Sequence, residues 1–211
     1  MAAAPGPIHT YFLGEQDYRQ TWTRMREKTE SRGPETPDEL WVLSHPAVYT
    51  LGQAGRHEHI LRLDDTPVIE TDRGGQVTWH GPGQIIAYPL LDLRRWNLGI
   101  RRLVHTLEDA VLALLLDHRI DGERRPDAPG VYVDGAKIAA LGLRVRRGCS
   151  YHGVALNVEN DLAPFQRINP CGYAGLRTTR LRDLGVRAAV EDLEQRFAHH
   201  IRAAIAASYS D

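Results

Sequence analysis

The sequence predicts an α+β fold, in which helices pack on a largely antiparallel or mixed sheet. Strand-like segments cluster in the middle of the chain as hairpins, while amphipathic helices lie toward both ends and between groups of strands. The regular strand–helix alternation of a parallel sheet does not occur. The 211 residues contain no repeat and no low-complexity linker, so we expect one domain over residues 1–211.

Three segments have the spacing of amphipathic helices: residues 15–30, 99–119 and 188–207. The middle segment is the clearest, because its apolar residues fall on one helical face. These residues are Leu103, Leu107, Val111, Leu114 and Leu115.

Strands are expected between the helices. ELWVLSHPAVYTLG (39–52) reads as one or two strands interrupted at His45-Pro46, and PVIETD (67–72) as a short strand after a polar loop. Glycine turns divide residues 73–93 into further strands. Asp134-Gly135 between two apolar runs predicts a tight hairpin, and CSYHGVALNV (149–158) adds one more strand.

Composition excludes several classes of protein. The 26 basic and 27 acidic residues leave a net charge of −1, so no global basic field attracts nucleic acid or an anionic membrane. No apolar run approaches the roughly 20 residues that span a bilayer, and the first residues do not resemble a signal peptide. With only two cysteines, we expect a cytoplasmic protein with free thiols. A monomer is the simplest expectation.

Lysine is rare in this chain, and one of its two lysines lies in an apolar strand. Lys28 and Lys137 are the lysines among the 26 basic residues. Strand alternation puts Lys137 on one face with Ala139, Leu141 and Leu143, which predicts a partly buried amine. Burial favours a neutral amine, which can take a proton from a neighbouring thiol. The alternative is a structural lysine whose ammonium reaches solvent beside the turn.

Either cysteine is a candidate nucleophile. Cys149 has cationic neighbours, which stabilise a thiolate. Strand alternation, however, puts His152 on the opposite face, and this favours a structural role for Cys149. Cys171 follows Asn169-Pro170 and precedes Gly172 in a stiff loop, which suits attack on an acyl carbon. A buried, inert loop cysteine is the alternative.

RGGQVTWHGPG (73–83) is rich in glycine but matches neither phosphate-loop template. Its glycines allow a backbone to approach an elongated ligand, or they simply form turns. His57-Glu58-His59 lacks a third ligand at metal-binding spacing, and His199-His200 face different directions on a helix. We therefore predict no metal and no cofactor.

Three long motifs together resemble one known family. RGGQVTWHGPGQ (73–84), APGVYVDGAKIAALGLRVRRGCSYHGVALNV (128–158) and LAPFQRINPCGYAGL (162–176) are similar in order and spacing to the octanoyltransferases of lipoate assembly, also called lipoyl(octanoyl) transferases or lipoate-protein ligase B. The family-like core covers about residues 40–185. Trp79 and Val154 stand where Tyr and Leu are common in the family, and both keep the side-chain type.

The resemblance implies a fold similar to the catalytic domain of biotin and lipoate protein ligases. It implies an acyltransferase that moves an octanoyl group from octanoyl-acyl carrier protein to a lysine of a lipoyl domain, in a 2-oxoacid dehydrogenase complex or the glycine cleavage H protein. It implies an acyl-thioester on Cys171, activated by Lys137. The substrate contacts that it implies are Arg73, Gly74, Gly75, Gln76, Val77, Thr78, Trp79, His80, Ala140, Leu141, Gly142, Gly153, Val154 and Ala155.

Three other functions remain open at this point. The first is an ATP-dependent lipoate or biotin protein ligase on the same fold. The second is a non-catalytic module that binds acyl groups or docks a carrier. The third is a cysteine hydrolase, in which water is the acceptor.

Overall fold

The computed structural model describes residues 5–62, 64–126, 128–173 and 175–210, without the side chains of Cys171 and Ser210. A seven-stranded sheet runs through this part of the molecule. Its strand order is β1-β2-β6-β10-β9-β8-β7. The first pair is parallel and the others are antiparallel. The strands are β1 (Ile8–Glu15), β2 (Asp38–Ser44), β6 (Gln84–Leu90), β7 (Glu123–Arg124), β8 (Val131–Val133), β9 (Ala136–Arg146) and β10 (Cys149–Asn157).

A second sheet of three short strands carries the order β4-β3-β5, with β3 parallel to β4 and antiparallel to β5. Its strands are β3 (Val48–Leu51), β4 (Val68–Glu70) and β5 (Val77–His80). The remaining elements are the helices α1 (Tyr18–Ser31), α2 (Ile100–Asp117) and α3 (Val190–Ser210), and the 3-10 turns η1 (His57–His59), η2 (Ala163–Arg167) and η3 (Pro170–Gly172). The predicted mixed α+β architecture is confirmed.

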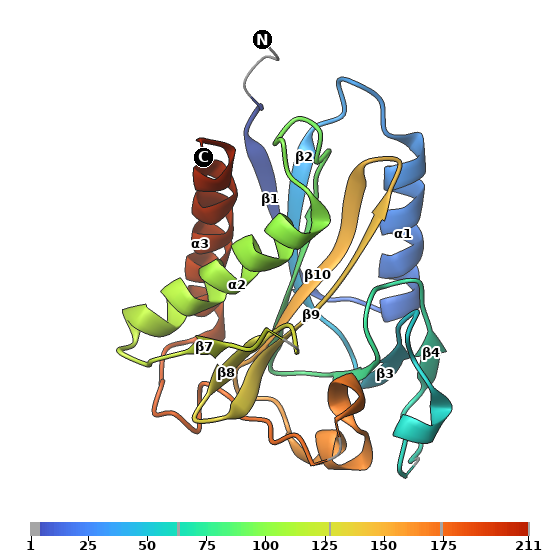
Figure 1. Cartoon of the computed structure of the whole chain (residues 1–211), viewed down its shortest axis with the longest axis vertical. Coiled ribbons are helices and arrows are strands. Elements are labelled where there is room, and N and C mark those ends of the chain that lie inside the picture. Colours follow the sequence, from blue (N-terminus) through green and yellow to red (C-terminus); the bar gives the residue numbers. More distant parts are fainter. Residues whose placement is uncertain (1–4, 63, 127, 174, 211) are drawn as a thin grey trace.

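Strand alternation divides the sheet into two differently covered faces. In β6, Ile85 and Ala87 belong to the main core with α2 and α3, whereas Ile86 and Tyr88 lie on the other face, in a smaller cluster with Met25 of α1. Figure 1 shows α2 and α3 on one side of the sheet and α1 on the other. In the described residues, no helix is long and apolar enough to cross a membrane.

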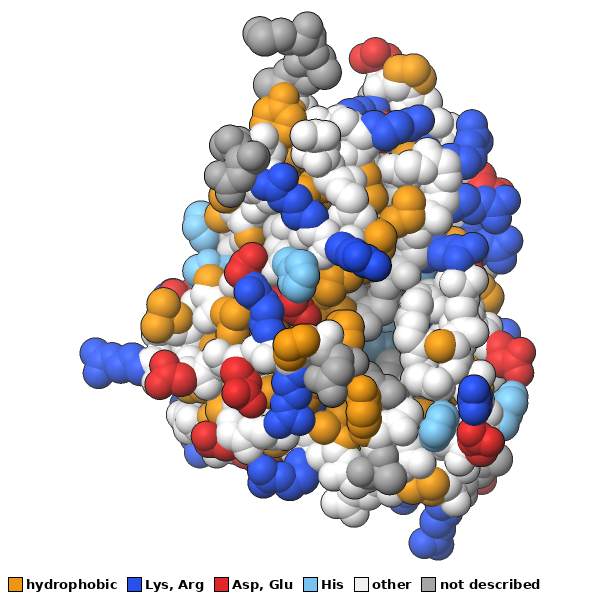
Figure 2. Space-filling model, viewed as in Figure 1, with side chains coloured by type: hydrophobic (Ala, Val, Ile, Leu, Met, Phe, Trp, Pro, Cys, Tyr) orange, Lys and Arg blue, Asp and Glu red, His pale blue; other side chains and the backbone are white. Residues whose placement is uncertain are grey.

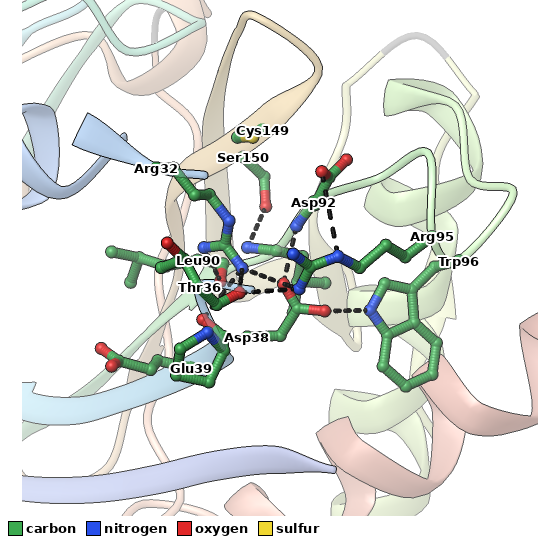
Figure 3. A network of polar contacts seen from close by, with 12 residues as sticks. Arg32, Thr36, Asp38, Glu39, Leu90, Asp92, Arg95, Trp96, Cys149 and Ser150 are labelled. Atoms are coloured by element: carbon green, nitrogen blue, oxygen red, sulfur yellow. Dashed lines mark hydrogen bonds and ion pairs between the residues drawn. The ribbon is translucent and has the colours of Figure 1, made fainter. Parts of the chain in front are cut away.

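A buried carboxylate fastens the loops at one end of the sheet (Figure 3). Asp38 pairs with Arg32, accepts a hydrogen bond from the Trp96 indole at 2.7 Å, and accepts another from the backbone N–H of Asp92 at 2.8 Å. The Arg32 guanidinium also donates to the carbonyl of Leu90 at 3.0 Å. These partners compensate the cost of burying the Asp38 charge, and they tie the end of α1 to β2 and to the segment after β6.

A buried histidine joins the two sheets. His45 lies between β2 and β3 and is fully buried. Its Nδ1 lies 2.6 Å from the carbonyl oxygen of Gln16, and its Nε2 lies 2.9 Å from the Tyr88 hydroxyl. Since the carbonyl can only accept, Nδ1 carries the proton, and Nε2 accepts the hydrogen bond from Tyr88. Burial lowers the pKa of His45 to about 4.

The structure also requires glycine at one close contact between strands. A Cβ built on Gly153 of β10 would lie 2.1 Å from the carbonyl oxygen of Ala87 in β6. We expect Gly153→Ala to destabilise the protein by about 2 kcal/mol or more, because backbone must move to admit the methyl group. Urea unfolding measures this loss. The exposed Gly33 has no atom within 4 Å of its Cβ position, so Gly33→Ala is the control and should change stability by less than about 0.5 kcal/mol. Equal stabilities would contradict the contact.

Acidification should weaken the fold through its buried histidines. The folded-state pKa of His45 lies below the ordinary value of 6.5, so the unfolded chain takes up the proton first as pH falls. The stability is complete above about pH 6.5 and is lost toward pH 4, with His45 contributing on the order of 2–3 kcal/mol. Urea unfolding between pH 7 and pH 4.5 checks this. His45→Gln should flatten the slope, whereas substitution of the exposed His9 by Gln should leave it unchanged; equal slopes in all three proteins would refute it.

Candidate acyl-binding cavity

One cavity collects most of the residues that the sequence singled out. It lies between the sheet face that α1 covers and residues 73–80, and it holds about 740 Å³ of empty space, including its open mouth. Figure 2 shows the surface hollowed near the middle of the face where β9 and β10 lie in Figure 1. The expected contact residues that line it are Arg73, Gly75, Gln76, Val77, Thr78, His80, Ala140, Leu141, Gly142, Gly153, Val154 and Ala155.

Small side chains create this space. Ala140 of β9 stands directly opposite Ala155 of β10, and Gly142 stands opposite Gly153. All four residues line the cavity. Because two adjacent strands carry almost no side chain on this face, the sheet forms a shallow trough where larger residues would fill the gap.

A buried arginine holds the opposite wall. The Arg73 guanidinium donates to the carbonyl oxygens of Thr50, Gly74 and Gln76 at 2.6–2.8 Å, and to the Thr50 hydroxyl. The N–H of Gly74 donates to the carbonyl of Leu143 in β9 at 2.9 Å. Gly74 thus fastens this wall to the sheet and is not among the cavity-lining residues, so its expected contact with substrate stays a prediction.

Trp79 also lies behind the cavity wall. Its ring packs edge-on against Phe165, with centroids 5.7 Å apart, in a cluster with Tyr49 and Val77. Phe165, in turn, lines the cavity. The expected contact between Trp79 and substrate therefore stays a prediction, and the observed role of the indole is to support a neighbour.

Lys137 lines the cavity, but not on the face that simple alternation predicted. A register shift between β8 and β9 pairs Tyr132 with Lys137 and Val131 with Ala139, which leaves Ile138 as an extra residue. Ile138 and Ala139 both pack in the main core, whereas Lys137 lies with Ala140 and Gly142 at the cavity. The predicted grouping of Lys137 with Ala139 and Leu143 is therefore wrong, because a β-bulge interrupts the alternation.

The amine of Lys137 is held inside the protein. The residue is 3% exposed, its Nζ donates to the carbonyl of Pro129 at 3.0 Å, and it lies 5.2 Å from the centroid of the Tyr132 ring. Gly130 makes room for it, since a Cβ there would lie 3.1 Å from Nζ. This burial excludes the alternative in which the ammonium of Lys137 reaches solvent beside the turn.

The turn that carries Cys171 lies at the edge of the same cavity. Pro170 of this turn lines the cavity, and so does Thr178, which forms a β-bridge with Lys137. A Cβ on Gly172 would lie 3.5 Å from Nε2 of His59 and 3.7 Å from the Gln76 side chain. The side chain of Cys171 lies outside the described atoms, so its pairing with Lys137 stays a prediction.

Cys149 occupies a different place. It is 3% exposed, and burial is the main cause that raises the pKa of its thiol, followed by the charge of Asp92. It is not among the residues that line the cavity. A structural role fits this environment, as expected from the sequence.

His152 shares a face with Tyr151, although strand alternation predicted it on the face opposite to Cys149 and Tyr151. His152 has a left-handed backbone, with φ of 57°, which breaks the alternation of β10. His152 and Tyr151 therefore both reach the same carboxylate, Asp72. Their hydrogen bonds and that of Trp22 hold the pKa of Asp72 well below its usual range despite partial burial.

The histidines at 57 and 59 lie beside protein side chains. His57 pairs with Glu70 at 2.9 Å, and His59 lies beside Asn169, with its Nδ1 3.5 Å from the amide nitrogen. Within the described residues, no group of three or more His, Cys, Asp or Glu side chains is placed to hold a metal ion.

Several lining residues were not anticipated. Period-two spacing in β6 would have shown that Gln84, Ile86 and Tyr88 share a face, but the sequence alone did not say which face meets a ligand. His152, Asn157 and Pro170 lie beside residues that the sequence singled out, whereas Tyr18, Phe165 and Thr178 come from segments that the fold brings to the cavity. These additional residues are Tyr18, Gln84, Ile86, Tyr88, His152, Asn157, Phe165, Pro170 and Thr178.

Comparison with known proteins gives the family. Residues 17–202 match the sequence model described as "Lipoyl protein ligase A/B catalytic domain", a longer range than residues 40–185. A protein named octanoyltransferase from Halorhodospira halophila is 64% identical over 208 residues, covering 99% of this chain and 96% of that protein. One from Alkalilimnicola ehrlichii is 64% identical over 198 residues, covering 94% and 92%.

Solved structures share the fold at low identity. Lipoate-protein ligase A bound with ATP superposes with a TM-score of 0.77 at 15% identity, covering 93% of this chain and 85% of that one. Biotin protein ligase from Aquifex aeolicus gives a TM-score of 0.57 at 15% identity, covering 93% and 68%. The match over residues 17–202 shows that the chain belongs to the lipoyl protein ligase A/B catalytic domain family. Its 64% identity to two octanoyltransferases shows that it belongs with these acyltransferases of lipoate biosynthesis.

Proposed function

We propose that this enzyme transfers an octanoyl group from octanoyl-acyl carrier protein to a specific lysine of a lipoyl domain, through a thioester on Cys171. The observation that carries the proposal is a buried amine, Lys137, in an apolar cavity at whose edge the turn of Cys171 lies. The cavity suits the acyl chain and the amine suits activation of a thiol. The acyl contacts in this proposal are the residues already expected between positions 73 and 80, 140 and 142, and 153 and 155.

The first half-reaction needs no external energy source. Lys137 takes the proton of the Cys171 thiol, and the thiolate attacks the thioester carbonyl of the donor. The carbon–sulfur bond to the carrier then breaks, and the carrier thiolate recovers the proton from Lys137. One thioester replaces another, so nucleotide activation is unnecessary, in agreement with the absence of a phosphate-loop pattern in RGGQVTWHGPG.

The second half-reaction uses the acyl-enzyme. The amine of the target lysine attacks the Cys171 thioester, an amide forms, and the carbon–sulfur bond breaks to release the thiolate. In this proposal Lys137 accepts the proton that the amine loses. Acceptors are lipoyl domains of 2-oxoacid dehydrogenase complexes and the glycine cleavage H protein. No cofactor takes part, and the cytoplasmic location and monomeric state stay predictions.

The mechanism predicts a covalent adduct. Incubation with octanoyl-acyl carrier protein, without ATP, should add one octanoyl group to the protein, and hydroxylamine should remove it. Addition of apo lipoyl domain should transfer the group to that domain. Intact-mass spectrometry follows both steps. An ATP requirement would favour a ligase, free octanoate as the product would favour a hydrolase, and an active protein without any adduct would exclude the covalent mechanism.

The two cysteines provide a matched pair of variants for this experiment. Cys171→Ala should abolish adduct formation, because it removes the nucleophile. Cys149→Ala should keep the adduct, since that thiol is buried away from the cavity. An adduct that survives in Cys171→Ala but disappears in Cys149→Ala would reverse the assignment.

The rate of acylation should depend on the ability of Lys137 to exchange a proton. Lys137→Arg keeps a positive charge but cannot act as a base at neutral pH. We expect acylation of Cys171 to slow by about 100-fold or more, as measured by rapid-quench mass spectrometry. Lys28→Arg is the control, because Lys28 pairs with Glu39 away from the cavity. An acylation rate within twofold of the wild type for Lys137→Arg would leave this lysine a structural role only.

A further inference from the structure

The cavity has an open side at β9 and a closed side at β6 and α1. Its rim is partly open to solvent, at Gln76, Thr78, Leu141 and Thr178. From there it extends across β10 toward β6 and α1. The lining residues on that side are closed off from solvent, and three of them are rings: Tyr18, His80 and Tyr88 are 3%, 6% and 4% exposed.

We propose that the rings of Tyr18, His80 and Tyr88 form the closed end of the acyl site and set the longest chain that the enzyme accepts. This inference rests on the proposed octanoyl transfer and names a determinant of its specificity. The three rings come from α1, β5 and β6, so they converge on the cavity from separate elements.

These rings support one another through His45, which stands behind them. The Tyr18 and His80 rings are stacked, with centroids 6.0 Å apart. His45 contacts Tyr18, His80 and Tyr88 at centroid distances of 5.0, 5.9 and 5.9 Å. Its bonds to Gln16 and to the Tyr88 hydroxyl hold it in place.

A rigid end wall gives a sharp limit on chain length. Each methylene that enters the apolar cavity strengthens binding by about fourfold, because it leaves water. A chain that is too long must displace a ring that is packed on both sides, and close-packed interiors do not accommodate extra methylenes without strain. Affinity should therefore rise with chain length and then fall.

The test compares the wild type with two variants that shorten the wall. Tyr88→Leu and Tyr18→Leu each remove a ring, from β6 and from α1 respectively. With octanoyl-, decanoyl- and dodecanoyl-acyl carrier protein in competition, we expect the ratio of dodecanoyl to octanoyl transfer to rise tenfold or more in each. Tyr88→Phe keeps the ring and loses only the hydroxyl, so its ratio should stay within twofold of the wild type.

Equilibrium binding separates this inference from the proposed function. Isothermal titration of the wild type with free octanoate, decanoate and dodecanoate should show weaker binding beyond the limiting length, and the leucine variants should remove that decline. If binding follows this pattern but no acyl group is transferred, the proposed function fails and the end wall stands. If octanoyl transfer is observed but both folded leucine variants keep the wild-type ratios, the end wall is refuted. Should neither variant fold, wild-type affinity that keeps rising to dodecanoate would refute it equally.

Discussion

The close approach of backbones at Gly142 and Gly153 is the constraint on which the site depends. A Cβ on Gly142 would lie 2.9 Å from the carbonyl oxygen of Gly74, and one on Gly153 would lie 2.1 Å from that of Ala87. These contacts bring the Arg73 segment and β6 against the two strands that carry the trough. Larger residues at either position would fill the cavity and also push its walls apart.

The buried polar groups around the cavity act mainly by holding its walls in place. The Arg73 guanidinium donates hydrogen bonds to backbone carbonyls and so fixes the glycine-rich segment. His45, His80 and His152 all have pKa values that burial lowers, which keeps these imidazoles neutral at pH 7. The neutral rings of His80 and His152 line the cavity, so an alkyl chain can contact them without desolvating a charge.

The sequence predicted the regular elements well, because helical spacing, the Asp134-Gly135 turn and the glycine turns are local signals. It did not reveal β1, whose parallel pairing with β2 is a long-range contact. It placed Lys137 and His152 wrongly within their strands, since a bulge and a left-handed residue depend on the neighbouring strands. Tyr18 and Tyr88 were missed at the site because only the fold brings α1 and β6 together at the cavity.

The bulge beside Lys137 makes this part of the chain sensitive to changes in length more than to changes in composition. The amine of Lys137 lies at the cavity only because the extra residue, Ile138, separates it from the regular alternation that begins at Ala139. A one-residue deletion between the Asp134-Gly135 turn and Ala140 would shift the register and send the amine, or the small residues after it, to the opposite face. Over evolutionary time, insertions and deletions should therefore be rejected in this hairpin even where conservative substitutions are tolerated.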